Sequence, residues 1–345
     1  MSTTKIMKKS NSTVLIGLID RLPFFCDAFF METGNKMSPS TKISYARELN
    51  RFFDYLIDVN FFGKNYSSKN DILVTDLELI TPSIISKYLT MYLNADYAER
   101  TVARIKATLG SFFKYMVVNR YLEYNPVSAS AHIKIHTSSE VIHLTTEEQS
   151  ILLDAVEQGN TLPKRKQTYH NRYALRDLSI FLLFLDTGIR VSELHGLSIL
   201  DIDLNSCSAI VTRKGGNLDT VYFSDDTKQA LEDYLYDRSH YENLEQHSPL
   251  FVTLGGNRLS VRAIQEVVKK YTTSAIPSKH KLSPHKMRSS FAMTYYEETK
   301  DLLALQRKLA HKNIQTTTIY AKASDKKMQE TRGVASSARN RTKHD

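Results

Sequence analysis

The pattern of apolar and polar positions predicts that the first third of the chain is helical. Apolar residues recur there at intervals of three and four residues, which is typical of helices with one buried face. The pattern predicts four helices, over residues 13–31, 38–57, 81–93 and 99–122. Pro23 is expected to kink or split the first of them, because proline disrupts a helix interior. We therefore expect a flexible segment over residues 1–12 and a four-helix domain over residues 13–126.

The helical period is lost after this region, and a second domain begins further along. Asn125-Pro126 is expected to end the first domain, and residues 127–143 have no sustained period, which indicates a linker. Residues 144–148 then open a new helix with a capping-type start. We expect the second domain to cover residues 144–323 and residues 324–345 to form a tail with too few apolar residues for a core.

The second domain is predicted to combine helices with a short β-hairpin. The apolar run from Ile180 to Leu185 indicates a buried helix, and Gly188 suits the left-handed residue that ends it. Residues 207–212 and 218–223 are predicted to be two strands, with residues 213–217 as their connection. The remaining pattern predicts helices over residues 225–236 and 260–271 and a short strand or extended segment over residues 250–254. The expected fold class is thus mainly α with a small β-sheet or hairpin.

Length, charge and cysteine content narrow the class of protein. The chain has 345 residues, enough for two domains that each bury a core. Its 46 lysines and arginines exceed its 37 acidic residues, which gives a net charge of +9. This excess suits a polyanionic partner, although a basic balance also simply aids solubility. Cys26 and Cys207 are far apart in sequence, so a disulfide scaffold is not expected and a reducing compartment fits.

The basic and apolar start of the chain imitates a secretory signal peptide. Asp20 and Arg21 interrupt its apolar run, and no small-residue cleavage site follows. No uninterrupted apolar run approaches the roughly 18 residues needed to span a bilayer. We therefore expect a soluble, cytoplasmic protein without a membrane partner.

Candidate chemistry is concentrated between residues 283 and 321. His285 and Arg288 lie one helical turn apart, so both can face the same ligand. His311 follows after an amphipathic interval, and Tyr320 comes nine residues later. Arginine neutralises oxyanions, histidine moves protons and a phenol can act as a nucleophile, a set that suits attack on a phosphodiester. Each residue alone has an ordinary structural explanation, and only their order and spacing together favour a site.

Two further candidates lie upstream of this stretch. Arg190 directly follows the predicted buried helix, so its backbone is held in place, as a phosphate-binding residue requires. Glu193 lies one turn later, and the alternative interpretation is a surface ion pair worth roughly a few tenths of a kcal/mol. Lys214 lies at the predicted hairpin tip, where a lysine is normally a solvated turn residue.

These motifs together resemble the tyrosine recombinases of the phage integrase and Xer type. The matching pieces are TGIRVSEL around Arg190, RKGGN around Lys214, HKMR from His285 to Arg288, LAHKNIQTTTIYAK around His311 and Tyr320, and TVARIKATLGSFFKYMVVNRYLEYNP near the middle. They occur in the family's order and span most of residues 40–323. Ser289 stands where a second histidine is frequent, and Ala310 replaces a common glycine. Asp219 and Thr220 stand in the part of the hairpin where a basic residue is common.

The resemblance implies an N-terminal four-helix, SAM-like core-binding domain and a C-terminal α+β catalytic domain. It also implies cleavage of DNA through a 3′-phosphotyrosyl intermediate. The implied roles are nucleophile for Tyr320, general acid for Lys214, clamps on the phosphate for Arg190 and Arg288, proton movement for His285, a hydrogen bond for His311 and orientation for Glu193. No Gly-rich nucleotide loop or Cys/His metal cluster is evident, so neither a cofactor nor a metal is expected.

The expected partners also follow from the resemblance. They are double-stranded DNA and further copies of the chain, assembled as a tetramer on DNA in the nucleoid. The DNA-contact candidates are Lys42, Arg47, Arg51, Arg100, Arg104, Lys114, Arg262, Lys279 and Lys281, each of which could equally be solvated surface charge. Two other activities stay open, namely type IB topoisomerase-like relaxation and noncatalytic regulation by DNA binding. Integration, excision and resolution are equally open as biological tasks, as are accessory proteins.

The tail has two interpretations. Its composition suits a disordered basic segment that binds DNA by charge. The resemblance implies instead a segment that passes to the neighbouring subunit, with Met328 and Val334 as anchors of a short docked helix.

Overall fold

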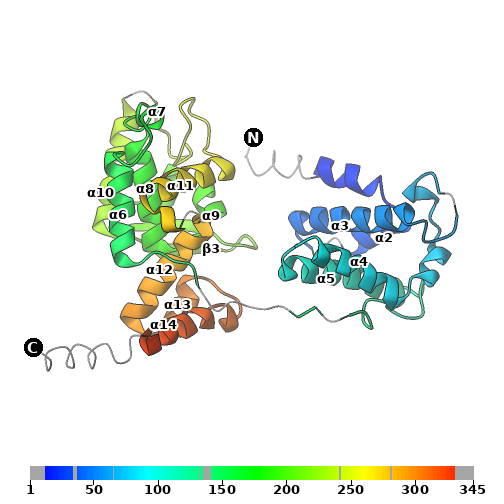
Figure 1. Ribbon diagram of the computed structural model, residues 1–345. Coiled ribbons are helices and arrows are strands. Elements are labelled where there is room, and N and C mark those ends of the chain that lie inside the picture. Colours follow the sequence, from blue (N-terminus) through cyan, green and yellow to red (C-terminus); the bar gives the residue numbers. More distant parts are fainter. Residues whose placement is uncertain are drawn as a thin grey trace, which may run out of the picture. The chain divides into compact units, whose positions relative to one another are not determined.

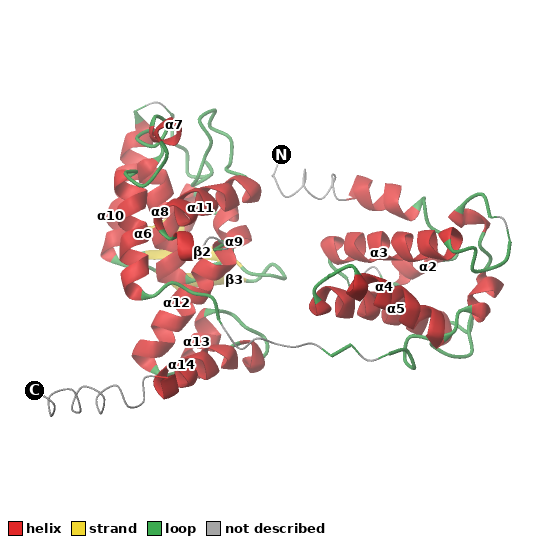
Figure 2. Cartoon of the chain, viewed as in Figure 1, coloured by secondary structure: helices red, strands yellow, loops and turns green. Residues whose placement is uncertain are grey.

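The computed structural model describes the chain in two compact units, residues 1–137 and 138–345 (Figure 1). The described residues are 12–33, 37–64, 66–131, 133–134, 141–240, 242–279 and 282–330. Both units are mostly helical, and the strands lie in the second (Figure 2). No helix in these ranges is long and apolar enough to cross a membrane.

The first unit contains the four predicted helical regions. Its elements are a helix over residues 12–19, α2 (Cys26–Glu32), α3 (Pro39–Asp58), η1 (Lys69–Asp71), η2 (Val74–Leu79), α4 (Pro82–Asn94) and α5 (Glu99–Val118). Pro23 splits the first region into two helices, which is one of the two outcomes predicted, a kink or a split. The last helix ends at Val118 rather than Leu122, because Arg120 adopts a left-handed conformation with φ of 61°. The 3₁₀ turns η1 and η2 lie between α3 and α4, where the sequence pattern predicts no helix.

Paired phenylalanines on α3 and α5 form the centre of this unit. Phe53 meets Phe112 edge to face, with ring centroids 6.1 Å apart, and Phe52 meets Phe113 in the same way at 6.2 Å. All four side chains are fully buried. Edge-to-face contact suits the aromatic quadrupole and adds to the free energy of burial. The outer faces of α3 and α5 are therefore left for polar and basic residues.

The second unit combines helices with a small sheet. Its elements are α6 (Thr146–Gln158), α7 (Lys164–Gln167), α8 (Ala174–Thr187), α9 (Val191–Gly196), η3 (Ile199–Asp201), β1 (Ile202–Asp203), β2 (Ser208–Thr212), β3 (Leu218–Tyr222), α10 (Asp225–Ser239), α11 (Val261–Ala275), η4 (Pro277–Lys279), α12 (Pro284–Thr299), α13 (Leu302–Lys308), η5 (Ile314–Thr316) and α14 (Thr318–Glu330). The start of α6 has the capping box that the sequence indicated, formed by Thr145 and Glu148.

The sheet is antiparallel in the order β1-β2-β3. Its register pairs Thr212 with Leu218, so residues 213–217 form the loop of the predicted hairpin. The short edge strand β1 was not predicted. Residues 250–254 are not a strand, although Val252 makes an isolated bridge to Arg258.

Helix α8 lies at the centre of the second unit, packed against α6, α10 and α12. It ends at Gly188, which adopts the expected left-handed conformation with φ of 59°. A β-carbon at this position would lie 2.3 Å from the ring of Phe291. Glycine is thus required both by the backbone conformation and by the close approach of α12.

Helix α14 extends past residue 323, the expected end of the second domain. Ser324 is buried, and Lys300 donates to its hydroxyl at 3.2 Å. The start of the expected tail is therefore helical. Val334 and the side chain of Met328 lie outside what the structure describes.

Candidate active site

Arg288 lies on the buried side of α12 and joins two other segments of the site. Its side chain is only 2% exposed. Nη1 donates to the carbonyl of Gly188 at 2.6 Å, and Nη2 donates to the carbonyl of Leu309. Loss of hydration and the nearby charge of Arg190 lower the pKa of Arg288 to about 10, so the guanidinium stays charged at neutral pH. These bonds fix it between the end of α8 and the segment that follows α13.

Arg190 is the N-cap residue of α9 and is held by Glu193. Its backbone amide lies 2.9 Å from Oε2 of Glu193, and its Nη1 lies 2.7 Å from Oε1. Glu193 is buried, whereas 33% of the Arg190 side chain is exposed. Burial raises the pKa of Glu193, but hydrogen bonds from Arg190 and the charge of Arg213 outweigh it and lower that pKa. This is not a surface ion pair, because the carboxylate is inside and only the arginine reaches solvent.

Arg213 belongs to the same network, although the sequence did not mark it as a site residue. It is 7% exposed, and its Nη1 lies 2.7 Å from Oε2 of Glu193. Its Nε donates to Asp219 at 2.9 Å, and its Nη2 donates to the carbonyl of Lys308 at 3.1 Å. Alternation along β2 could have found it, because inward positions recur every second residue and include Ala209 and Val211.

Lys214 lies beside Arg213 at the exposed tip of the hairpin. Gly215 and Gly216 follow with φ of 105° and 90°, a conformation that side chains rarely tolerate. In the described part of the chain, the Lys214 ammonium makes no hydrogen bond or ion pair. It is therefore available to a ligand.

His311 lies after α13 and before the helix that carries Tyr320. Its Nδ1 lies 3.0 Å from the hydroxyl of Thr317, which is fully buried. Loss of hydration, followed by the charges of Arg288 and Arg190, lowers the pKa of His311 to about 4. The ring is thus neutral at neutral pH. The preceding Ala310 has φ of 46°, which explains why glycine is common at this position in the family it resembles.

His285 projects from the first turn of α12 and is exposed. Loss of hydration lowers its pKa, and the charges of Lys286, Arg288 and Arg190 lower it further. A neutral imidazole is a proton acceptor, so His285 is suited to take a proton rather than to carry one at neutral pH.

Tyr320 lies in the first turn of α14 with its side chain 3% exposed. It packs in an apolar cluster with Phe291, Leu305 and Leu309. Burial raises its pKa, whereas the nearby Ser289 hydroxyl and the charge of Arg288 oppose this rise. Ser289, one of the departures from the family pattern, thus acts on the candidate nucleophile. The phenol is neutral and needs a base before it can attack.

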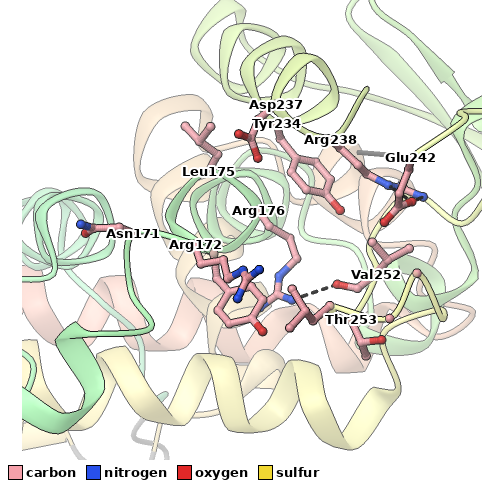
Figure 3. Close-up of a pocket in the computed structure, with 14 residues that line it drawn as sticks. Asn171, Arg172, Leu175, Arg176, Tyr234, Asp237, Arg238, Glu242, Val252 and Thr253 are labelled. Atoms are coloured by element: carbon pink, nitrogen blue, oxygen red, sulfur yellow. Dashed lines mark hydrogen bonds and ion pairs between the residues drawn. The ribbon is translucent and has the colours of Figure 1, made fainter. Parts of the chain in front are cut away.

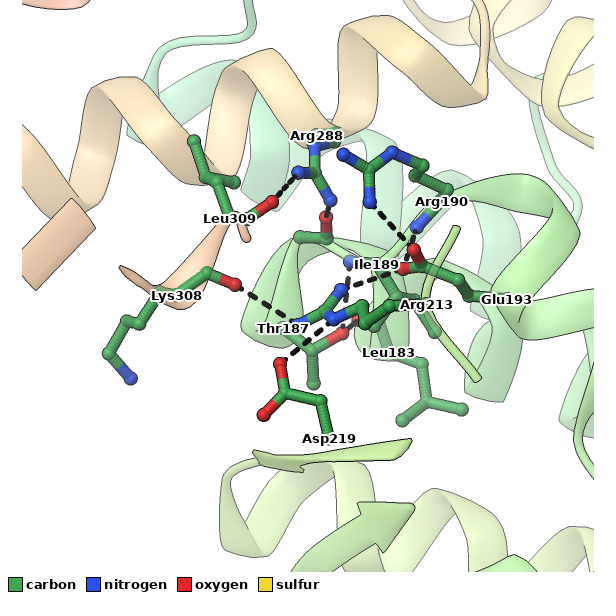
Figure 4. A network of polar contacts seen from close by, with 11 residues as sticks. Leu183, Thr187, Ile189, Arg190, Glu193, Arg213, Asp219, Arg288, Lys308 and Leu309 are labelled. Carbon is green, nitrogen blue, oxygen red and sulfur yellow. Dashed lines mark hydrogen bonds and ion pairs between the residues drawn. The ribbon is translucent and has the colours of Figure 1, made fainter. Parts of the chain in front are cut away.

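The structure brings these candidates into one site. Figure 4 shows Arg190, Glu193, Arg213 and Arg288 around the end of α8 and the start of α9. The charges of Arg190 and Arg288 act on both histidines, and that of Arg288 also acts on Tyr320. Lys214 is attached to the group through its neighbour Arg213. Cationic donors, neutral imidazoles and a buried phenol together suit attack on a phosphodiester.

Comparison with known proteins agrees with this site. Residues 143–327 match the phage integrase family, and residues 30–119 match the phage integrase N-terminal SAM-like domain. The chain belongs to the phage integrase family. A tyrosine recombinase XerC from Thermodesulfovibrio yellowstonii is 31% identical over 70% of this chain and 78% of its own. Another XerC, from Natranaerobius thermophilus, is 30% identical over 79% of this chain and 86% of its own.

The protein is accordingly a tyrosine recombinase, an enzyme that cleaves and rejoins DNA strands at specific sites. Its expected two-domain fold is confirmed. A solved structure of the XerH site-specific recombinase bound to palindromic difH substrate has the same fold, with a TM-score of 0.65 and 20% identity. That likeness covers 84% of this chain and 78% of XerH.

A cavity of about 600 Å³ lies elsewhere in the recombinase (Figure 3). Two of its three arginines are bonded within the protein, since Arg176 binds Asp177 and the Val252 carbonyl while Arg238 binds Glu242. None of the seven predicted catalytic and orienting residues lines it. Among the described residues, no group of three or more His, Cys, Asp or Glu side chains is arranged to hold a metal ion.

The predicted DNA-contact residues of the first unit fall into two groups. Arg51 and Arg104 each lie 3.1 Å from Oε1 of the buried Glu48, so one carboxylate holds both guanidiniums at the surface. The other group makes no ion pair as far as the structure describes the chain, and it consists of Lys42, Arg47, Arg100 and Lys114. Lys42 is partly buried, and the other three are exposed.

The candidates of the second unit are differently placed. Arg262 is exposed and pairs with Glu266 at 3.2 Å. Lys279 donates to Glu148 at 2.5 Å and to the carbonyl of His143 at 2.7 Å. Its ammonium therefore already has two acceptors within the protein. Lys281 lies outside the described residues.

Proposed function

We propose that Tyr320 is the nucleophile of the recombination reaction. Its phenolic oxygen attacks a scissile phosphate, forms the phosphotyrosyl bond at the 3′ end and releases the 5′ oxygen of the next nucleotide. A 5′-hydroxyl of a partner strand then attacks the phosphotyrosyl phosphorus and frees the tyrosine. The number of phosphodiester bonds is unchanged, so no external energy source is needed. The observation that carries this proposal is a buried phenol in one apolar cluster with Leu309, whose carbonyl accepts a hydrogen bond from Arg288. The charge of Arg288 also acts on that phenol.

Arg190 and Arg288 are proposed to bind the nonbridging oxygens of that phosphate. Charge on these oxygens grows as the phosphorus is attacked, and fixed cationic donors stabilise it without reorganisation. Two backbone carbonyls hold Arg288, and Glu193 orients Arg190 while leaving part of its side chain open to solvent. Both guanidiniums are thus positioned before substrate binds.

Proton transfer is proposed to involve His285 and Lys214. His285 takes the phenolic proton, directly or through a water, since its lowered pKa keeps the imidazole neutral. Lys214 gives a proton to the leaving 5′ oxygen from the hairpin tip. His311 donates a hydrogen bond to a nonbridging oxygen, which requires its hydrogen on Nε2. The hydroxyl of Thr317 favours that form if it donates to Nδ1, which lies 3.0 Å away.

The proposed substrate is double-stranded DNA with two sites brought together by several copies of the chain, a tetramer in the full complex. The net charge of +9 and the basic outer faces of α3 and α5 suit phosphate contact. The XerH relative was solved bound to its difH substrate. Because the curated relatives cited above are XerC proteins, we favour recombination at a short site of Xer type, with integration and excision as the alternative tasks.

A nicked suicide substrate tests the nucleophile. Cleavage upstream of the nick releases a short fragment, so a covalent adduct accumulates and survives denaturation. Tyr320→Phe is expected to bind the DNA but form no adduct. Tyr295→Phe is the matched control, because Tyr295 packs against the same apolar cluster, and it is expected to form the adduct. An adduct with the Tyr320 variant, or its loss only in the Tyr295 variant, would reject the assignment.

A further inference from the structure

We propose that Arg213 is a positioning residue that fixes the β2–β3 hairpin to the catalytic centre and thereby sets the position of Lys214. This inference rests on the proposed role of Lys214 as general acid. Lys214 lies on an exposed loop with two glycines, so nothing in the tip itself determines where its ammonium lies. The adjacent residue, however, is a buried arginine with three acceptors (Figure 4).

The direction of the Arg213 side chain follows from the strand. Ala209 and Val211 point into the core of the second unit, and Arg213 continues this alternation one residue beyond the last ladder pair. Its backbone amide still donates to the carbonyl of Asn217 at 2.8 Å. Arg213 therefore closes the base of the loop from the inside, and Lys214, the next residue, is exposed in the turn.

The three acceptors belong to three different parts of the site. Glu193 is the residue that holds Arg190, and its second oxygen lies 2.7 Å from Arg213. Asp219 lies on β3, so its bond to Nε at 2.9 Å joins the two strands of the hairpin. The carbonyl of Lys308 ends α13, close in sequence to His311, and accepts from Nη2 at 3.1 Å. One guanidinium thus connects the hairpin, the phosphate-binding arginine and the segment before His311.

This arrangement requires an arginine in particular. The planar guanidinium offers five donors in fixed directions, whereas a lysine ammonium is a single point charge on a flexible stem. Lysine at position 213 could neutralise Glu193 but could not also reach Asp219 and the Lys308 carbonyl. Arg213→Lys consequently separates the charge of residue 213 from its positioning function.

The chemical test compares two substrates. In an ordinary phosphodiester, the bond from phosphorus to the 5′ oxygen breaks while the tyrosine–phosphorus bond forms, and the leaving oxygen takes a proton. In a 5′-bridging phosphorothiolate the sulfur leaves without one. If Arg213 positions Lys214, Arg213→Lys and Arg213→Met should slow cleavage of the phosphodiester about tenfold to hundredfold and slow the phosphorothiolate far less. In the Lys214→Ala background, the same changes should add little on the phosphodiester.

A second buried arginine provides the matched control. Arg238 pairs with Glu242 and donates to the carbonyls of Pro249 and Leu250, away from the site. Arg238→Lys should lower the melting temperature as Arg213→Lys does, but leave the ratio of the two cleavage rates unchanged. Equal slowing of both substrates by the Arg213 variants would show that Arg213 acts through Arg190 or through the fold, and would overturn the proposal.

Hydrogen exchange tests the attachment of the hairpin independently of Lys214 chemistry. Amides of residues 208–222 should exchange faster in Arg213→Lys than in the parent chain, while those of α8 stay protected. Unchanged exchange in the hairpin would also overturn the proposal. If Lys214→Ala itself is not rescued by the phosphorothiolate, the general-acid role fails. The exchange experiment then decides alone whether Arg213 fixes the hairpin.

Discussion

Glu193 binds Arg190 twice, through the backbone amide at 2.9 Å and through the guanidinium at 2.7 Å. The first bond caps α9, and the second fixes the direction of the side chain. Because the carboxylate is buried, Arg190 cannot leave it without removing one of the two guanidiniums, Arg190 and Arg213, that neutralise it. Arg190 is both the residue that starts α9 and the cation that faces solvent, so Glu193 fixes the start of the helix and the guanidinium together.

Glu193→Gln should retain the fold but slow cleavage. Glutamine keeps the shape of the side chain and one acceptor, yet it loses the charge shared by Arg190 and Arg213. Hydrogen bonds to charged groups contribute about 1.5–3 kcal/mol, so we expect cleavage to fall about tenfold to hundredfold. Single-turnover cleavage at saturating protein measures this, with half-site affinity as the control. Cleavage at the parental rate would show that Arg190 needs no orienting partner.

The same change should alter the dependence of stability on pH. The pKa of Glu193 is lowered from its ordinary value of 4.5, so the folded chain keeps this carboxylate ionised where the unfolded chain binds a proton. Its contribution is therefore fully present above about pH 4.5 and is lost as the pH falls below that value. Urea unfolding of Glu193→Gln should show a shallower loss of stability on acidification than the parent chain. An equally steep loss would mean that other carboxylates dominate.

Thr317→Val should slow cleavage by acting through His311. The substitution keeps the volume of the side chain but removes the hydroxyl that lies 3.0 Å from Nδ1. Loss of one neutral hydrogen bond corresponds to about 1 kcal/mol, or about a fivefold slower cleavage. Thr317→Ser keeps the hydroxyl and should stay near the parental rate. If serine and valine behave alike, the effect comes from packing and not from the histidine.

Much of the fold was predictable because its signals are local. The buried run before Gly188, the proline-initiated helices and the hairpin around residues 213–217 each follow from short-range periodicity and turn chemistry. The helix end at Val118 was misjudged, because apolar residues continue to Leu122 although the backbone already turns at Arg120. Apolar residues that pack against the core from a loop give the same sequence pattern as one more helical turn.

The candidate site was predictable only in part, since its long-range contacts leave no local pattern. Arg213 read as a turn residue because its neighbours are lysine and glycines, although its partners lie 20 and 95 residues away. In the sequence Ser289 is only a departure from the family pattern, whereas in the fold it acts on the phenol of Tyr320. Contacts of this kind depend on which helix ends lie next to one another, and the packing of the whole core determines this.

The structure also changes how the end of the chain should be tested. Removal of residues 324–345 would cut α14 at Ser324, which is buried and bonded to Lys300. Removal of residues 331–345 keeps the helix that carries Tyr320. If the end of the chain binds a neighbouring subunit, this deletion should weaken strand exchange between two sites far more than half-site binding. A lower half-site affinity and salt slope with normal exchange at saturating protein would indicate an electrostatic DNA contact instead.

Lys279 and Arg47 should respond in opposite ways to alanine substitution. Lys279 has two acceptors within the second unit, the Glu148 carboxylate and the His143 carbonyl, and loss of both bonds should lower the free energy of unfolding by about 1–2 kcal/mol. Arg47 is exposed and makes no ion pair among the described residues, so Arg47→Ala should leave stability unchanged.

In DNA binding, Arg47→Ala should have the larger effect and Lys279→Ala the smaller one. If Arg47 contacts a phosphate, its removal should weaken half-site binding across all sequences and reduce the salt slope by about 1, because one counterion fewer is released. Lys279→Ala should leave that slope unchanged, since an ammonium already bound to a carboxylate releases no DNA counterion. Urea unfolding and half-site binding at several salt concentrations separate the two cases. A reduced slope for Lys279→Ala would mean that DNA displaces Glu148 from Lys279, and an unchanged slope for Arg47→Ala would remove Arg47 from the DNA-contact surface.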